Sequence, residues 1–345
     1  MARQVRIRVS GGWYHVCSRG HNRETIFCCQ RDREHFLELV EGMRERFRVR
    51  VCAYCIMNTH YHLLLRTPEA NISQAVQWLN GSYGIWFNKL HERSGHLFGE
   101  RFKAILVENG ATGLEVSVYL HMNPVATKAF GLGKKERAVQ AAGIGTPPSR
   151  EVVERRLAKV RTFRWSSYRA YAGYGKAETW LDRGELLDRL GKTEEEQTTR
   201  YRALLEGRIR QGQDEDLWSQ VRWGLVLGGE RFARKVRGRI VVTVQSRNRR
   251  ELRRRRDFDE IVRMVERRKG SKWEAFRDGY GDWGRDLVLW AGRQFGGLKL
   301  SELAVKVGAA SDSAVSMAIK RLQQRSLQHR DIRRAMHAVT KECEK

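Results

Sequence analysis

The chain of 345 residues has no long hydrophobic run and only a few irregularly spaced cysteines. No apolar stretch approaches the roughly 20 residues that span a bilayer, so we expect no membrane segment and a cytoplasmic protein. The cysteines are too few and too scattered for a disulfide framework, and we expect free thiols. They are Cys17, Cys28, Cys29, Cys52, Cys55 and Cys343.

Acidic residues are also scarce, with 40 Asp and Glu against 66 Lys and Arg, a net charge of +26. Such a charge predicts a polyanionic partner such as nucleic acid. Residues 1–130 carry 17 basic and 11 acidic side chains, and residues 131–345 carry 49 and 29. Most phosphate-binding capacity is therefore expected in the carboxy-terminal part. A hydrophobic fraction of 41% excludes a disordered basic tail protein.

The sequence lacks a glycine-rich phosphate loop, paired carboxylates and a Ser/His/Asp order. It has His60 and His62, two residues apart at the start of a predicted strand, where both side chains project from one face. Two such imidazoles can share a divalent cation, although a strand with two half-buried histidines fits as well. Cys52 and Cys55 lack the second cysteine pair of a zinc site and are expected to be structural.

Tyr119 and Asn123 lie four residues apart on a predicted helix, so they stack on one face. The amide oxygen of Asn123 is a suitable ligand for Mg²⁺ or Mn²⁺, and the phenolic oxygen of Tyr119 can attack phosphorus. The alternative is that Tyr119 only packs the helix onto a sheet. His121 points away from Tyr119 on such a helix and is not expected in the site.

Hydrophobic periodicity predicts the order β-α-β-β-α-β-α for the first part of the chain. This order is typical of an α+β, ferredoxin-like split βαβ domain, with two helices on one face of a four-stranded antiparallel sheet. Asp32 is expected to cap the first helix. The predicted strands are 3–18 (broken at Gly11-Gly12), 49–57, 60–66 and 98–108, and the later helices are 71–90 and 112–121.

Composition predicts four regions. Residues 1–130 form the catalytic domain, and residues 131–180 hold a basic insertion, outside the core up to residue 160, followed by the aromatic segment 165–174. Residues 181–257 read as a charged helical connector that ends in an arginine-rich run, 247–256, which either holds phosphates or is a solvated helix. Residues 258–345 read as a helical domain with a helix-turn-helix.

An ordered set of short motifs resembles the HUH single-strand DNA transposases, especially the REP-associated tyrosine transposases of the IS200-like group. The set spans about half of the chain and is more specific than any one motif. Its members are His15-Val16, Arg19-Gly20, Ile26-Phe27, Ala53-Tyr54, Met57-Asn58, His60 to Leu64, Gly95 to Phe98, Arg101 to Lys103, Tyr119 to Val125 and Trp165 to Tyr168.

The resemblance implies a metal-dependent nuclease and strand transferase that cuts single-stranded DNA beside a hairpin, such as a REP-like palindrome. It implies that Tyr119 is the nucleophile, which leaves a 5′-phosphotyrosine and a free 3′-hydroxyl. His60, His62 and Asn123 would hold the cation, Mg²⁺ or Mn²⁺. Three basic residues are expected to contact the DNA: Arg19, Arg101 and Lys103.

A second resemblance, over about 50 residues near the end of the sequence, is to the duplex-binding domain of the bacterial replication initiator. It is carried by residues 298–322, with Ser301 and Ser311 as expected helix caps and residues 311–325 as the recognition helix. The alternative is a small helical bundle with a basic surface and no base readout. The residues expected to contact duplex DNA are Ser313, Lys320, Arg321 and Arg325.

Two other functions remain open. One is a domesticated regulator that binds hairpin DNA without turnover, and the other is a relaxase or rolling-circle initiator with the same chemistry. The sequence is compatible with a monomer or a homodimer. In each case DNA as the partner predicts association with the nucleoid.

Overall fold

The computed structural model describes the chain except residues 1–5, 134–135, 137–147, 212–216, 244–255 and 345. The described residues divide into two units. The first consists of the chain up to Gln220 together with Leu227–Gly229, and the second consists of Val221–Val226 and Glu230–Lys345. The first unit therefore takes in most of the region that composition assigns to an insertion and a connector. None of the described helices is long and apolar enough to cross a bilayer.

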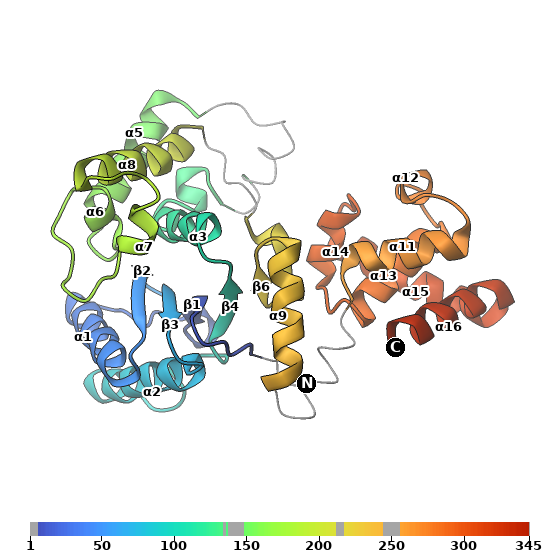
Figure 1. The fold of residues 1–345 in the computed structure, drawn as a ribbon, viewed down its shortest axis with the longest axis horizontal. Coiled ribbons are helices and arrows are strands. Elements are labelled where there is room, and N and C mark those ends of the chain that lie inside the picture. The colour runs from blue at the N-terminus through green and yellow to red at the C-terminus, as the bar shows by residue number, and fades with distance from the viewer. Residues whose placement is uncertain (1–5, 134–135, 137–147, 212–216, 244–255, 345) are drawn as a thin grey trace. The chain divides into compact units, whose positions relative to one another are not determined.

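An antiparallel sheet forms the centre of the first unit (Figure 1). Its main strands are β1 (Gly12–Arg19), β2 (Arg50–Ile56), β3 (His60–Thr67) and β4 (Lys103–Val107), in the order β2-β3-β1-β4. A strand of two residues, β6 (Val226–Leu227), follows β4 in the sheet order, so the sheet goes beyond the four strands that the sequence predicts. The strand β5 (Val221–Arg222) falls in the second unit.

Helices cover both faces of this sheet. On one face lie α1 (Gln30–Phe47) and α2 (Ile72–Leu90), and buried Tyr61 of β3 points to them, since its ring contacts Phe36 and its hydroxyl donates to Asn80. On the other face lies α3 (Ala111–Met122), which packs on β2 and β3. The order β-α-β-β-α-β-α and the α+β class are confirmed.

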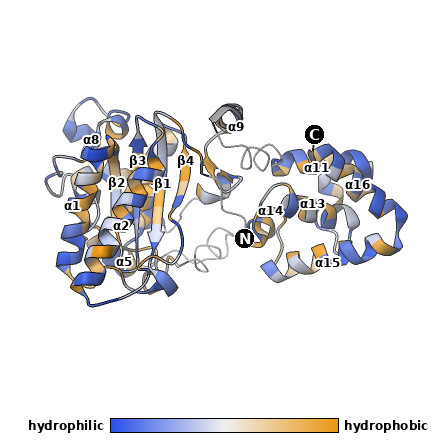
Figure 2. Cartoon of the chain, turned by 90° about the horizontal axis from the view of Figure 1, so that it is seen from below, coloured by the Kyte–Doolittle hydropathy of each residue, from blue (hydrophilic) through white to orange (hydrophobic). Residues whose placement is uncertain are grey.

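Two predicted strands are shorter than expected. The first begins only at Gly12, because Gly11 turns the chain with a φ of 72°. The residues before this turn stay irregular, and the hydroxyl of Tyr14 accepts a hydrogen bond from the backbone N–H of Val9. The fourth strand covers Lys103–Val107 instead of residues 98–108. In β4, hydrophobic residues predominate (Figure 2).

The aromatic segment after residue 164 lies along the outer edge of β2. The N–H of Ile56 donates to the carbonyl of Trp165 at 2.8 Å, and the N–H of Ser167 donates to the carbonyl of Tyr54 at 3.1 Å. Further along the edge, Val51 forms a parallel bridge with Leu181. A short helix, α6 (Tyr168–Tyr171), follows the first contact.

Part of the expected insertion is a core helix, which corrects the prediction that residues 131–160 lie outside the core. Ser149 caps α5 (Arg150–Thr162), whose Leu157 and Val160 are buried. Arg156 is buried too and donates to the carbonyls of Phe130 and Ile209, the latter on α8 (Glu194–Gln211). The helix belongs to the core because its apolar side chains recur at helical spacing. A further short helix, α7 (Gly184–Leu187), precedes α8.

The second unit is helical. Its core lies among α11 (Phe258–Lys269), α12 (Trp273–Phe276), α13 (Trp283–Gln294), α14 (Leu300–Lys306), α15 (Asp312–Gln328) and α16 (Arg330–Glu344). Gly308, with a φ of 62°, makes the turn between α14 and α15. α9 (Glu230–Thr243) precedes this core in the chain. The arginine-rich run falls outside the described residues except Arg256, which donates to the backbone carbonyls of Glu342 and Cys343.

Of the two predicted caps in this unit, one is correct. Ser311 is the N-cap of α15, and its hydroxyl accepts a hydrogen bond from the N–H of Ala314 at 3.2 Å. Ser301 lies inside α14, because that helix begins at Leu300 and its N-cap is Lys299. The N–H of Lys299 donates to the carboxylate of Glu302 at 2.7 Å, which satisfies the helix start without a serine.

Candidate active site

Three histidines share the face of the sheet that α3 covers. His60 and His62 lie two residues apart on β3, and His15 on β1 lies on the same face because it pairs with Leu64. His15 and His62 are buried, and their rings stack with an interplanar angle of 10° and centroids 5.2 Å apart. The ring of His60 meets that of His62 edge-on at 5.0 Å.

Tyr119 of α3 faces these imidazoles. Its half-buried ring lies edge-to-face with the ring of His62, at 6.0 Å between centroids, and with the ring of His15, at 6.1 Å. The sheet and the last helix of the split βαβ arrangement therefore bring His60, His62 and Tyr119 together. The side chain points at the histidine face, so the helix-packing interpretation alone does not describe its surroundings.

Hydrogen bonds decide which ring nitrogens of the two β3 histidines remain available. Nδ1 of His62 lies 2.9 Å from Nε2 of His15, and Nδ1 of His60 lies 3.0 Å from the hydroxyl of Thr59. In both β3 histidines Nε2 is left as the atom that can bind a ligand. A metal-binding histidine typically has such a partner on its other nitrogen.

Burial keeps these imidazoles neutral at pH 7. Desolvation, together with the charge of Arg19, lowers the pKa of His60 to about 4, and desolvation lowers the pKa of His15 to about 3. The pKa of His62 is also far below its usual value, chiefly because the side chain is fully buried. Neutral imidazole is the form that binds a cation, so His60 and His62 fit a divalent metal.

Asn123 stands at the carboxyl end of α3, one turn after Tyr119. Its amide nitrogen donates to the carbonyls of Tyr119 at 2.9 Å and Leu120 at 3.2 Å, so the nitrogen is used within the helix end. The amide oxygen is the atom left for a ligand. Within the described part of the chain, no hydrogen bond joins Asn123 to either β3 histidine.

The three basic residues predicted to bind DNA in this unit line one cavity. Arg19, Arg101 and Lys103 border a space of about 570 Å³ together with the turn that contains His21. Arg19 is the register partner of His60, so the cavity adjoins the histidine pair. A phosphate backbone running through it would reach the face on which Tyr119 lies.

Sequence reasoning missed two members of this centre. One is His15, which belongs to the set of short motifs but for which the sequence predicts no role in the site. The other is Trp218, which lies on the short helix η3 (Leu217–Gln220), and its ring lies 4.8 Å from that of Tyr119 and 4.7 Å from that of His15. Strand alternation and the pairing of β1 with β3 could have indicated His15. No local pattern points to Trp218.

His121, excluded from the site by its position on the helix, has a structural role. It is fully buried, with Nδ1 2.7 Å from the hydroxyl of Tyr201 and Nε2 2.7 Å from the hydroxyl of Ser167. The hydroxyl of Tyr201 also lies 2.9 Å from that of Ser117. This network joins α3, which carries Tyr119, to α8 and to the segment at the β2 edge.

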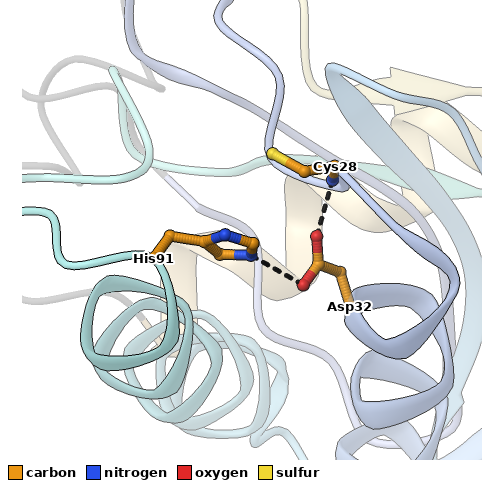
Figure 3. A group of neighbouring side chains, drawn as sticks. All are labelled: Cys28, Asp32 and His91. Atoms are coloured by element: carbon orange, nitrogen blue, oxygen red, sulfur yellow. Dashed lines mark hydrogen bonds and ion pairs between the residues drawn. The ribbon is translucent and has the colours of Figure 1, made fainter.

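A group with metal-ligand atoms lies elsewhere, at the start of α1 (Figure 3). Ligand atoms of Cys28, Asp32 and His91 all lie within 4.8 Å of one another. The buried carboxylate of Asp32 accepts hydrogen bonds from the N–H groups of Cys28 at 2.6 Å and Cys29 at 3.0 Å, and it lies 2.8 Å from Nε2 of His91. Cys29 therefore occupies the N-cap position that the sequence predicts for Asp32. Asp32 lies in the first turn of α1 instead, where its carboxylate accepts hydrogen bonds from the backbone N–H groups that precede the helix.

These hydrogen bonds connect the start of α1 to the end of α2, and both oxygens of the Asp32 carboxylate take part in them. Burial alone would raise the pKa of Asp32, but the hydrogen bonds from His91 and the two amides lower it overall. Burial and the nearby Asp32 raise the pKa of the Cys28 thiol, which disfavours the thiolate that binds metals. The contacts explain the group as the junction of α1 with the end of α2.

In the second unit the four predicted DNA contacts divide into two pairs. Ser313 and Lys320 are exposed on α15. The guanidinium of Arg321 makes two 2.8 Å hydrogen bonds to the buried carboxylate of Asp286, and Arg325 donates to a backbone carbonyl, that of Gly281, at 2.7 Å. The two arginines thus hold α15 within its own unit, while a phosphate-binding role for them stays a prediction.

Comparison with known proteins finds a similarity for the first part of the chain. Residues 8–123 match the family model described as "Transposase IS200 like". These residues are therefore similar to the IS200-like transposases, in agreement with the resemblance that the motifs carry. A solved structure titled "Structure of the REP associates tyrosine transposase bound to a REP hairpin" is similar at 13% sequence identity. It covers 53% of this chain and 92% of the other, with a TM-score of 0.36. No curated protein matches.

Proposed function

We propose that this chain is a metal-dependent endonuclease and strand transferase for single-stranded DNA, which cuts next to a hairpin through a phosphotyrosine intermediate. The observation that carries the proposal is the edge-to-face placement of Tyr119 over the buried pair of His15 and His62, beside His60. The match of residues 8–123 to the IS200-like transposase model supports a DNA-processing activity in general.

In this proposal the phenolic oxygen of Tyr119 forms a bond to phosphorus while the bond from phosphorus to the 3′ oxygen breaks. The phenol loses its proton, the 3′ oxygen gains one, and the products are a 5′-phosphotyrosine and a free 3′-hydroxyl. His60, His62 and Asn123 would hold Mg²⁺ or Mn²⁺ through Nε2, Nε2 and the amide oxygen. When bound, such a cation polarises a phosphate oxygen and stabilises charge on the leaving oxygen.

The DNA partner follows from charge and from the motif resemblance. Hairpin DNA of the REP-like type would lie along Arg19, Arg101 and Lys103 in the cavity beside His60. Duplex DNA would contact exposed Ser313 and Lys320 on α15, the helix that directly follows the Gly308 turn. Phosphate contacts would fix the register of the strand, and base contacts would choose the site.

The test is incubation of the full chain with single-stranded oligonucleotides that carry a hairpin, in the presence of Mn²⁺ or Mg²⁺. A covalent protein–DNA adduct should appear on a denaturing gel and should be absent with EDTA. Tyr119→Phe should abolish the adduct, whereas Tyr280→Phe, at a residue 92% exposed in the second unit, should retain it. Cleavage that survives Tyr119→Phe assigns another nucleophile. Tight hairpin binding with no cleavage in any metal indicates a regulator without turnover.

A further inference from the structure

The ring of Trp218 contacts both Tyr119, the proposed nucleophile, and His15. Its ring meets the ring of Tyr119 at an interplanar angle of 78° and lies against the ring of His15 at 38°, with centroids less than 5 Å away in both cases. His15 in turn is hydrogen-bonded to His62. One indole therefore touches the nucleophile and the residue that orients a candidate metal ligand.

We propose that Trp218 is a positioning residue of the active site, holding the Tyr119 ring in the orientation that points its hydroxyl at the bound phosphate. The inference rests on the proposed function. A half-buried tyrosine near the end of a helix has freedom about its side-chain bonds unless neighbours restrict it. The indole, edge-to-face with the Tyr119 ring and tilted against His15, restricts it without adding a charge near the reacting atoms.

The contact depends on the ring and not on a hydrogen bond. Nε1 of Trp218 is buried and has no hydrogen-bond partner in the part of the chain that the structure describes. A buried N–H without a partner adds no stabilisation, so the indole nitrogen does not hold the two neighbours and the aromatic ring carries the contact. Leu217, which is 8% exposed, anchors the short helix that presents the indole.

Trp218 comes from a part of the chain outside the matched region. The family match ends at residue 123, whereas Trp218 lies beyond α8, which packs on α3. The hydrogen-bond network of His121 and Tyr201 fixes α8 to α3. The short helix η3 lies outside the matched residues 8–123, and it would therefore complete the surroundings of Tyr119, which lies inside them.

The first experiment measures single-turnover adduct formation and hairpin affinity separately. Trp218→Ala should slow adduct formation about 10- to 100-fold, the cost typical of a misplaced reacting group, while the Kd for the hairpin stays within about threefold. Trp218→Phe, which keeps an aromatic ring, should restore the rate to within about threefold of the parent. Trp78→Ala, at a half-buried tryptophan that packs on Phe47, is the matched control and should change neither value.

The second experiment needs neither metal nor DNA. In protein labelled with 3-fluorotyrosine, the ¹⁹F resonance of residue 119 is the one lost in Tyr119→Phe. Trp218→Ala should shift this resonance toward the position of a solvent-exposed fluorotyrosine, and Trp78→Ala should leave it in place. This signal reports the surroundings of the ring whether or not the protein cuts DNA.

The outcomes separate the two proposals. If the parent protein forms no adduct on any hairpin, the proposed function fails. If the parent forms the adduct and Trp218→Ala is equally fast or faster, or if the fluorine resonance does not move, only the role of Trp218 is overturned. The same conclusion holds if Trp218→Phe is as slow as Trp218→Ala, because the indole N–H and not the ring would then matter.

Discussion

Nε2 of His15 lies 2.9 Å from Nδ1 of His62, and the two rings are nearly parallel. Since both imidazoles are neutral, one donates and the other accepts. If His15 donates from Nε2, His62 carries its proton on Nε2 and cannot bind a cation there. Metal binding therefore requires the tautomer in which Nδ1 of His62 donates to His15, and Nε2 of His15 is placed to accept that hydrogen bond.

We expect His15→Phe to weaken Mn²⁺ binding by about 10- to 100-fold, because the ring stack is kept while the partner of His62 Nδ1 is lost. Isothermal titration of the DNA-free protein with Mn²⁺ measures the affinity directly. His35→Phe, at a histidine stacked on Trp86 on another face, is the control and should leave the affinity unchanged. Equal affinities for the parent and His15→Phe would remove His15 from the metal site.

The buried network of His121 predicts how stability changes with pH. Burial lowers its pKa to about 3 in the folded chain, against about 6.5 in the unfolded chain, so the unfolded state takes up the proton first. The stabilisation is complete above pH 6.5 and is lost as the pH falls toward 3. Between pH 6.5 and pH 5 the free energy of unfolding should fall by about 2 kcal/mol from this group alone.

Urea denaturation of the full chain at pH 7 and pH 5 tests this expectation. His121→Gln should be less stable than the parent at pH 7 but should lose about 2 kcal/mol less between the two pH values. The comparison with the parent cancels the contributions of other groups. An unchanged pH dependence in His121→Gln would mean that the histidine is already protonated in the folded protein.

Local pattern predicts the parts of the site that lie within one element. The two-residue repeat places His60 and His62 on one face of a strand, and the four-residue spacing places Tyr119 and Asn123 on one side of a helix end. Both placements agree with the structure. The strand and helix order also follows from local pattern, because the helices repeat apolar residues at helical spacing and β2 and β3 are short runs rich in strand-forming residues.

Contacts between distant elements are what the sequence alone does not predict. His15 reaches His62 only through the pairing of β1 with β3, and Trp218 reaches Tyr119 through the packing of a short helix. The helix α5 is missed for another reason. The glycine- and proline-rich residues before it resemble a loop, and they mask the apolar spacing of Leu157 and Val160.

The cavity that holds Arg19, Arg101 and Lys103 predicts a salt-dependent step. Arg101→Ala should weaken hairpin binding and lower the slope of log K against log salt by about 1, because one phosphate contact and its released counterions are lost. Fluorescence anisotropy at several salt concentrations gives this slope. Arg333→Ala, at an exposed side chain of α16, is the control; an equal slope change there would point to a general charge effect.

The ion pair of Arg321 with Asp286 predicts a stability effect instead of a DNA effect. Arg321→Ala leaves a fully buried carboxylate without its partner, which should lower the free energy of unfolding by about 3–5 kcal/mol at pH 7. Urea denaturation of the full chain measures the loss. Lys320→Ala, on the exposed face of the same helix, should change stability by less than about 0.5 kcal/mol.

The loss in Arg321→Ala should be smaller at pH 5. Burial already raises the pKa of Asp286 in the parent, although Arg321 opposes this, and removing the arginine leaves burial to act alone. Protonation then neutralises the carboxylate in the folded variant, which favours folding as the pH falls. A loss that does not depend on pH would attribute the effect to packing of the guanidinium.

The outer edge of β2 is occupied by the chain itself, first by Trp165 and Ser167 and then by Leu181. An exposed strand edge is a template on which a foreign strand can add and on which aggregation starts. Here those backbone groups are already satisfied at both ends of the strand. Deletion of residues 164–181 would therefore leave a protein prone to self-association through β2, even though its histidines and tyrosine were intact.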